Sequence, residues 1–487
     1  MKYLKSKSRI VTTLFSLALF VISFACSDSP SDDGPQEPPV NEVSLSEQNL
    51  LRAMDLADNA IASHFTGDGM AMARYYNPYT GVRSEEKGSI WMYTAAIEAV
   101  NAILHALETQ KEHGNAPLYD QHFSKYSETL ARLYDNADYY LGTFELVSYT
   151  QTKEWSVYGV NRGGSKGGAK VEGIENVYDD QMWLIRELLE SYHLTGNSDY
   201  LSKAEYLTEY VLDGWDCTFD HNGTERGGIP WGPGYVTKHA CSNGPMVSPL
   251  VWLHEIYKDQ TDEVTHRYID ATDKKTRVET QVTKGDYYLD FARKVYTWQK
   301  NALLRGDGVY DDMRGGCTPG SPETETIDGI TYRKGTSCQD RVGPAITYNS
   351  GTMLSGGADL YRATGDNTYL EDVRNLSDAS FSYFAKFGTA EPGYYTYDIS
   401  GFRNWFNGVL MRGWVDAYTS HSSVADYIDT FQKNLDYGYD NFLYKGFLPT
   451  NLLVGWSRDN ANNRTEGMFN FAFAAEYAVL SRFELEK

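Results

Sequence analysis

The sequence predicts an all-α fold, an (α/α)6 barrel of helical hairpins with long loops gathered on one face. Three observations support this class: twelve segments have the apolar spacing of amphipathic helices, a Gly-centred turn recurs between them, and strand patterns are few. Repeated helical hairpins form solenoids or closed rings, and twelve helices supply the six hairpins that one ring needs.

The predicted helices follow one another from residue 44 almost to the last residue. The first opens with the capping box Ser44-x-x-Glu47, and the sixth has Pro249 in its first turn. The others are expected from about residue 90, over 119–141, from 180, from 198, and over 285–303, 351–364, 367–386, 404–418, 423–435 and 466–483. Strand patterns are confined to 143–149 and 328–333, which we interpret as a hairpin or loop decoration.

A turn pattern repeats along the chain. Residues 191–201 read S-Y-H-L-T-G-N-S-D-Y-L and residues 360–370 read L-Y-R-A-T-G-D-N-T-Y-L. A broken copy covers 256–261 and resumes at 285–289 after a charged insertion. Each copy places Gly or a polar break at a helix end and Asn, Asp or Ser before the next helix, which is the chemistry of a tight turn between antiparallel helices.

The N-terminal residues have the pattern of an export signal. Residues 1–26 combine a basic start, an apolar core from Val11 to Phe24 and Cys26, as in a bacterial lipoprotein signal with Cys26 lipidated. A cleaved, unlipidated secretory signal is the alternative. Residues 27–43 are a Pro- and Asp-rich tether, and residues 44–487 form the barrel domain. The acidic residues after Cys26 resemble the export tag of surface lipoproteins, so we expect an outer-membrane lipoprotein at the cell surface; a periplasmic-facing position stays open.

The charge of the chain excludes several classes of partner. The formal net charge is −22, and removal of residues 1–26, which hold four basic and no acidic residues, makes it −26. Such a protein is a poor match for nucleic acid or for anionic membrane, so membrane contact is expected only through the lipid anchor. A neutral substrate suits it, and the 38 Tyr and 10 Trp include enough rings to line a carbohydrate groove. We expect a monomer.

Four cysteines remain after Cys26. In an exported protein an even number suggests disulfides, and pairing of sequence neighbours is the simplest of three connectivities. That pairing joins Cys217 to Cys241 and Cys317 to Cys338. The sequence has no C-x-x-C motif and no pair of histidines at zinc spacing, so neither a metal nor a cofactor is expected.

The stretch 172–185, E-G-I-E-N-V-Y-D-D-Q-M-W-L-I, carries the chemistry. Asp179 and Asp180 stand where a Gly-rich segment meets an amphipathic helix, and aromatic residues flank them. Capping of the helix is the ordinary role of Asp at this place. Two carboxyl groups at a helix entrance among aromatic rings are also what glycoside hydrolysis requires, one as nucleophile or base and the other as acid.

Four further motifs accompany this pair. G-G-I-P-W spans 227–231, K-H-A-C-S-N-G spans 238–244, T-Y-N-S-G spans 347–351, and F-N-G-V-L-M-R spans 406–412. With Y-D-D-Q-M-W at 178–183, these resemble the motifs of glycoside hydrolase family 76, the endo-α-1,6-mannanases, in family order over about residues 45–485. His239 stands where the family has Asn and Asn407 where it has Lys, which could alter subsite preference.

The resemblance implies an (α/α)6 barrel with its long loops on the active-site face, and retention of anomeric configuration. It also implies that Asp179 is the nucleophile and Asp180 the acid/base in cleavage of the backbone of yeast-type α-mannan. A non-catalytic glycan-binding outer-membrane lipoprotein is the main alternative. A different glycosidase or a transglycosylase on the same barrel is another.

Six residues are candidate sugar contacts. They are Tyr178, Trp91, Trp231, Asn243, Tyr348 and Asn349. Three of them have a structural alternative: core packing for Trp91 and capping for Asn243 and Asn349. Asp311 and Asp312 form a second acidic pair, which we interpret as turn residues with a smaller chance of a distal subsite role. Residues 163–170 lack the spacing of a phosphate loop and are expected to shape the cleft beside Asp179.

Overall fold

The structure, a computed structural model, describes residues 43–316, 320–338 and 340–487. The predicted signal, the lipidation site Cys26 and nearly all of the tether lie outside the described residues and stay predictions. The part from Ser44 to Lys487 forms one compact unit, and the following account concerns that unit.

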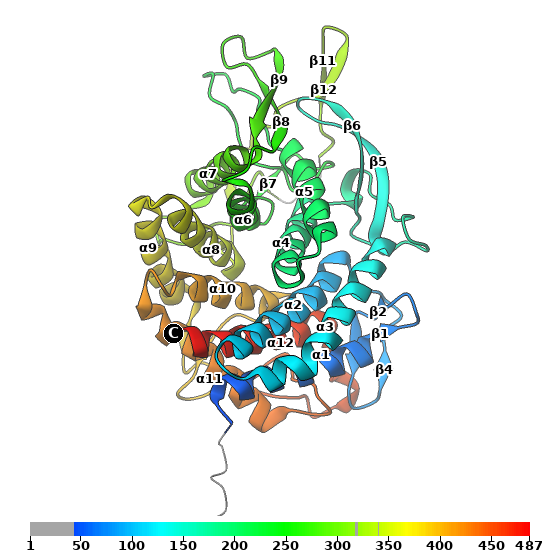
Figure 1. The fold of residues 1–487 in the computed structure, drawn as a ribbon, viewed down its shortest axis with the longest axis vertical. Coiled ribbons are helices and arrows are strands. Elements are labelled where there is room, and N and C mark those ends of the chain that lie inside the picture. The colour runs from blue at the N-terminus through cyan, green and yellow to red at the C-terminus, as the bar shows by residue number, and fades with distance from the viewer. Residues whose placement is uncertain (1–42, 317–319, 339) are drawn as a thin grey trace, which may run out of the picture. The chain divides into compact units, whose positions relative to one another are not determined.

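An inner ring of six helices closes on itself (Figure 1). Its members are α2 (Ile90–Glu112), α4 (Tyr178–Thr195), α6 (Val247–Tyr257), α8 (Thr347–Thr364), α10 (Arg403–Ala417) and α12 (Gly467–Glu486). Each contacts the next in this order, and α12 contacts α2. Helix α2 is apolar and long enough to span a bilayer by composition, but most of it is buried inside the fold, as in the core helix of a globular domain.

An outer layer of six helices covers the ring. Its members are α1 (Leu45–His64), α3 (Ala116–Ala137), α5 (Ser198–Asp213), α7 (Lys284–Leu303), α9 (Asn367–Phe384) and α11 (Ala425–Phe442). Each of α3, α5, α7, α9 and α11 packs on the inner helix before it, and α1 packs on α12, so the two ends of the described chain meet. The predicted (α/α)6 barrel is therefore confirmed.

The recurring turn has the backbone that its sequence requires. Gly196 and Gly365 end α4 and α8 at φ +68°, where a side chain would be strained, and their N–H groups bond back to the preceding turn. The next residues, Asn197 and Asp366, cap α5 and α9 by accepting a hydrogen bond from the backbone N–H two residues on.

Short β-elements decorate the barrel within the described residues. Three hairpins pair β5 (Leu141–Val147) with β6 (Thr152–Tyr158), β8 (Glu263–Ile269) with β9 (Arg277–Thr283), and β11 (Thr324–Ile327) with β12 (Ile330–Arg333). The shorter strands are β1 (Phe65–Thr66), β2 (Ala71–Met72), β3 (Tyr75–Asn77), β4 (Val82–Arg83), β7 (Lys238–His239), β10 (Met313–Arg314), β13 (Arg341–Val342), β14 (Lys386–Phe387), β15 (Tyr395–Thr396) and β16 (Thr465–Glu466). The predicted strand patterns fall on β5 and β12. The β8–β9 hairpin lies where the sequence predicts only a charged insertion, because polar residues occur on both of its faces.

Two arginines tie these hairpins together and to the loop beside the site. Arg277 of β9 lies over the ring of Tyr332 at 4.2 Å and donates to the Tyr149 carbonyl at 3.2 Å. Arg333 of β12 is buried and donates to the carbonyl of Pro233 at 3.1 Å and to that of Tyr235. The hairpins thereby fix the segment that follows Trp231.

Candidate active site

Asp179 and Asp180 lie in the first turn of α4, where the sequence places them. The N-cap residue is Val177, and no side chain caps this helix. Instead, the Tyr178 backbone N–H donates to the Trp231 carbonyl at 2.8 Å. Capping, the ordinary role of Asp at a helix start, therefore does not account for either carboxyl group.

Gln181 fixes this helix entrance to β6. Its Nε2 donates to the Tyr158 carbonyl at 2.8 Å, and its Oε1 accepts from the Tyr158 N–H at 3.1 Å. The paired hydrogen bonds hold α4 against the end of the strand, and the chain then continues into Val160 and Asn161 beside the aspartates. The segment 163–170 turns back onto β5 instead, with the Ala169 N–H bonded to the Leu141 carbonyl at 3.0 Å, so it does not line the cleft as we expected.

Both aspartates line a cavity of about 570 Å³, which lies in the range of roughly 300–1,000 Å³ that is usual for small-molecule sites. Aromatic side chains cover much of its surface: Trp91, Trp183, Trp231, Tyr235, Tyr348, Phe402, Trp405 and Phe406. These rings come from α2, α4, α8, α10 and the loop after α5, so the cavity exists only once the ring of helices has closed.

Burial raises the pKa values of the two carboxyl groups by different amounts. It raises the pKa of Asp179 to about 6, against hydrogen bonding that lowers it. Burial raises the pKa of Asp180 well above its usual range, and the negative charge of Asp179 raises it further. Asp180 therefore holds a proton under conditions in which Asp179 is largely ionised, and the pair titrates as a unit.

The Asp179 carboxyl faces the Cys241 thiol and the Trp231 indole N–H, both of which favour its charged form. Its Oδ1 is nevertheless buried without a hydrogen-bond partner in the described part of the chain, as is the Trp231 Nε1. Unpaired buried polar atoms are costly. A polar ligand group placed between these two atoms would satisfy both.

The Trp231 loop depends on two glycines. Gly227 and Gly228 have φ of +63° and +75°, and a Cβ on Gly228 would lie 2.3 Å from the Trp298 ring. Trp231 then stacks on His239, with centroids 4.6 Å apart and an interplanar angle of 18°. Burial lowers the pKa of His239 to about 4, so this ring is neutral and extends the aromatic surface.

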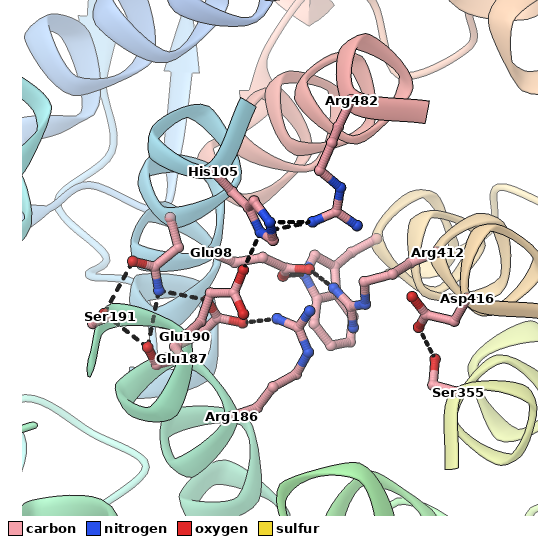
Figure 2. A network of polar contacts seen from close by, with 12 residues as sticks. Glu98, His105, Arg186, Glu187, Glu190, Ser191, Ser355, Arg412, Asp416 and Arg482 are labelled. Atoms are coloured by element: carbon pink, nitrogen blue, oxygen red, sulfur yellow. Dashed lines mark hydrogen bonds and ion pairs between the residues drawn. The ribbon is translucent and has the colours of Figure 1, made fainter. Parts of the chain in front are cut away.

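A second group of rings faces the pair from α2 and α10. Trp91 stacks on Phe406 with centroids 5.6 Å apart and meets Trp405 edge to face at 5.3 Å. The Trp405 Nε1 donates to Glu98 at 2.9 Å, and Glu98 also accepts from Arg412. Figure 2 shows Glu98 and Arg412 in the polar network between the inner helices. Trp91 therefore lines the cavity, and it also packs against Phe406 and Trp405. Its contact with a sugar stays a prediction.

Tyr348 and Asp312 line the cavity together. The Tyr348 hydroxyl donates to Asp312 Oδ1 at 3.4 Å, and burial raises the pKa of Asp312 to about 6. Asp311 points elsewhere, to Arg305 at 3.4 Å and Arg341 at 3.7 Å. Asp312 therefore lines the cavity, in keeping with the subsite role that the sequence left open, whereas Asp311 makes ion pairs away from it.

Three residues that were predicted to contact sugar, Tyr178, Asn243 and Asn349, do not line the cavity. Tyr178 is buried and packs on Tyr210, with centroids 5.0 Å apart. Asn243 holds the loop before it by donating to the carbonyls of Ile229 and His239 at 3.0 and 2.8 Å. Asn349 is fully buried and donates to the Asp311 carbonyl at 3.3 Å. Asn243 occupies the N-cap position of the short helix η3 (Gly244–Met246), without a side-chain hydrogen bond to that helix, whereas Asn349 lies inside α8 and is not a cap.

The predicted disulfide between Cys217 and Cys241 is wrong, because both are free thiols. Cys241 faces Asp179 in the cavity, whereas Cys217 lies in a different hollow beside Trp215. Cys338 is also a free thiol and donates to the Val236 carbonyl at 2.8 Å. Its predicted partner, Cys317, lies outside the described residues.

The model of glycosyl hydrolase family 76 matches residues 168–264 and 280–470, which is more than half of the chain. The chain belongs to glycosyl hydrolase family 76. It is therefore a glycoside hydrolase, and the aspartate pair lies within the matched region. The interval between the two matched segments holds most of the β8–β9 hairpin, which is outside the family pattern.

Curated relatives of this family-76 chain are yeast proteins. One is the mannan endo-1,6-alpha-mannosidase DCW1 of Candida glabrata, 24% identical over 183 residues, or 37% of this chain and 32% of the relative. The DCW1 protein of Saccharomyces cerevisiae is 24% identical over 185 residues, or 38% of this chain and 32% of the relative. The chain thus spans about a third of the length of these relatives.

Solved structures share the fold. The family 76 mannosidase Bt3792 of Bacteroides thetaiotaomicron has a TM-score of 0.65 at 18% identity, covering 90% of this chain and 99% of that one. An inactive variant of the α-1,6-mannanase GH76A of Salegentibacter sp., with two consecutive aspartates replaced by asparagine and α-1,6-mannotriose bound, has a TM-score of 0.54 at 18% identity, covering 89% and 99%. At this identity the likeness establishes the barrel alone.

Proposed function

We propose that this family-76 enzyme is a retaining endo-α-1,6-mannanase that cleaves the backbone of yeast-type α-mannan. The observation that carries the proposal is the pair Asp179 and Asp180, two buried carboxyl groups of unequal acidity in one aromatic cavity. The names of the relatives support the linkage, since they act on, or are bound to, α-1,6-linked mannose.

In the first step Asp180 acts as the acid and Asp179 as the nucleophile. Asp180 donates its proton to the glycosidic oxygen, the bond from that oxygen to the anomeric carbon breaks, and the shortened chain leaves as an alcohol. The Asp179 carboxylate forms a bond to the anomeric carbon from the opposite face and yields a β-linked mannosyl ester. Such a mechanism calls for carboxyl groups about 5–5.5 Å apart.

In the second step Asp180 acts as the base, the reverse of its role as the acid in the first step. Its carboxylate takes a proton from water, the water oxygen bonds to the anomeric carbon, and the ester bond to Asp179 breaks. The product is α-mannose at the new reducing end, and the pair returns to its starting protonation state. The unpartnered Oδ1 of Asp179 and the flanking Trp231 suit the charge that develops at the sugar.

Product analysis tests the proposal. Incubation with α-1,6-mannan should release new reducing ends, and early products followed by NMR should be α-anomers. Initial β-mannose would contradict retention, and the absence of new reducing ends from α-1,6-mannan would refute the substrate. Debranched and branched mannan compared side by side would measure how far side chains block the cavity, and the sizes of early products separate internal from terminal cleavage.

We further propose that the enzyme is exported and held at the outer membrane through lipidated Cys26. The basic start, the short apolar core and the acidic tether of the sequence support this. Metabolic labelling with a fatty acid should mark the parent and not a Cys26→Ala variant. Protease added to intact cells should digest a surface protein and spare one that faces the periplasm.

A further inference from the structure

A second cavity of about 420 Å³ lies beside the first turns of α10, separate from the one that holds the aspartates. Trp405 and Phe406 of this helix line the catalytic cavity, while Asn404 and Asn407 line the second one. The remaining lining residues come from the β14–β15 hairpin, α11, the loop 450–453 and α12. The two cavities have no lining residue in common.

Glu476 of α12 is the main polar group of this second cavity. It is 5% exposed, and its carboxyl has no hydrogen bond or ion pair within the described residues. Burial raises the pKa of Glu476 well above its usual range, and nearby Glu98 raises it further, so the group is a neutral acid with one donor and one acceptor. Gly408 makes room for it, because a Cβ there would lie 2.9 Å from Glu476 Oε1.

Other polar groups hold the shape of the cavity. Asn404 donates to the Thr450 carbonyl at 2.8 Å, and Asn407 donates to the Asp398 carbonyl at 3.0 Å, so both loops are fixed to α10. Asn434 of α11 donates to the Tyr395 carbonyl at 2.9 Å, while its Oδ1 is buried without a partner. The cavity is therefore formed before any ligand arrives, which reduces the entropic cost of binding.

The rest of the surface is largely apolar. Tyr397 and Phe431 lie with ring centroids 4.7 Å apart, and the Tyr397 hydroxyl is already paired with Thr430 Oγ1 at 2.8 Å, so this ring offers carbon surface. Two charged residues lie at the edge: Asp398 is paired with Arg403 at 3.2 Å, and Lys386 is exposed, with its ammonium group 5.9 Å from the centre of the Tyr383 ring. A ligand for this cavity needs apolar faces, hydroxyl groups for Glu476 and no net charge, because a buried unpaired charge would be costly.

We propose that this cavity is a second sugar-binding site, which takes a neutral pyranose unit of a glycan through Glu476. A pyranose ring has apolar C–H faces and hydroxyls that both donate and accept hydrogen bonds, and the cavity volume lies in the range of small-molecule sites. The site is non-catalytic, since Glu476 faces no second carboxyl within the same cavity other than the exposed and paired Asp398. It would hold a substrate chain beside the catalytic cavity.

Binding stoichiometry tests this site without depending on the reaction. The full chain with Asp179→Asn, which cannot hydrolyse the probe, is titrated with α-1,6-mannotriose by calorimetry and native mass spectrometry. We expect two trisaccharides per chain, and a crystal of the complex should show one against Glu476. A trisaccharide at the aspartate pair with none against Glu476 in the crystal would overturn the proposal, whether or not the parent enzyme cleaves mannan.

Three substitutions, each added to the Asp179→Asn variant, test whether the second trisaccharide binds at Glu476. Glu476→Leu should weaken it by about tenfold, the effect of losing a buried hydrogen-bonding group, whereas Glu476→Gln, which keeps a donor and an acceptor, should retain it. Ala390→Trp, on the exposed loop between β14 and β15, should fill the cavity and abolish it with little effect on folding. A second event that survives both Glu476→Leu and Ala390→Trp would place the sugar elsewhere and refute the assignment.

Discussion

The indole of Trp405 donates a hydrogen bond of 2.9 Å to Glu98, and the same carboxylate accepts from Arg412 (Figure 2). Trp405 lines the catalytic cavity and meets Trp91 and Trp183 edge to face. A charged pair between α2 and α10 therefore sets the orientation of a ring that lines the cavity of Asp179 and Asp180, although neither Glu98 nor Arg412 lines that cavity.

Replacing Glu98 should disturb binding more than chemistry. Glu98→Ala leaves the Arg412 charge without its partner and frees Trp405, so KM should rise severalfold with a smaller change in kcat. The loss of the buried partner should also lower the free energy of unfolding by about 3 kcal/mol. Glu98→Gln, which still accepts from the indole, should recover most of the KM. Steady-state kinetics on α-1,6-mannan and thermal unfolding of both variants measure the two effects, and equal changes in kcat for Ala and Gln would argue against a positioning role.

Removing either carboxyl of the catalytic pair should abolish hydrolysis. Asp179→Asn and Asp180→Asn should each reduce kcat by about a thousandfold or more, because each removes one half of the double displacement. Both variants should fold, since the amide keeps the shape of the carboxyl group, and Asp179→Asn also removes a buried charge. Asp199→Asn is the matched control, as Asp199 lies in the first turn of the next helix, α5, and is exposed. Either variant cutting mannan as fast as the parent would refute the assignment.

The pH dependence of activity should follow the pair. The nucleophile Asp179 must be ionised, and its pKa is raised to about 6, so kcat/KM should fall as the pH drops through about 6. At higher pH the rate should fall again when Asp180 loses its proton, since its pKa is raised further. A pH–rate profile on a soluble oligosaccharide checks both limbs. A rate that is independent of pH between 4 and 7 would contradict these roles.

The free energy of unfolding should fall as the pH rises towards 6, whereas kcat/KM rises over the same range. Asp179 has a higher pKa folded than unfolded, so the folded state binds more protons between about 4 and 6, and the free energy of unfolding falls as the pH rises through this window. The loss attributable to Asp179 should be about 3 kcal/mol. Asp179→Asn should therefore be more stable than the parent at pH 7 and nearly equal to it at pH 4, as chemical denaturation at the two pH values can measure.

The thiols should react as free cysteines. Alkylation of the denatured protein without a reductant, followed by peptide mass analysis, should label Cys217 and Cys241 completely. Dithiothreitol should leave the melting temperature and the activity unchanged, because no bond between these two residues is there to break. Recovery of a peptide that links Cys217 to Cys241 would restore the disulfide that the sequence suggested.

Much of the fold could be predicted from local patterns. The turns at Gly196 and Gly365 require a left-handed residue and a following cap, and these residue types are nearly unambiguous in sequence. The hairpin β8–β9 could not be recognised in this way, because both of its faces are partly exposed and polar His266 and Thr280 interrupt the apolar residues of one face. Capping and periodicity depend on residues that are close in sequence, so they can be recognised without the tertiary structure.

The sequence by itself determined the helical hairpins and the place of Asp179 and Asp180 at the entrance of α4. Only the tertiary structure decided which other side chains share their cavity: it brought in Asp312 and Cys241, and it sent Tyr178 into the core. The reason is that closure of the ring joins loops and helices far apart in the chain, and burial against them sets both the contacts and the acidity of each group.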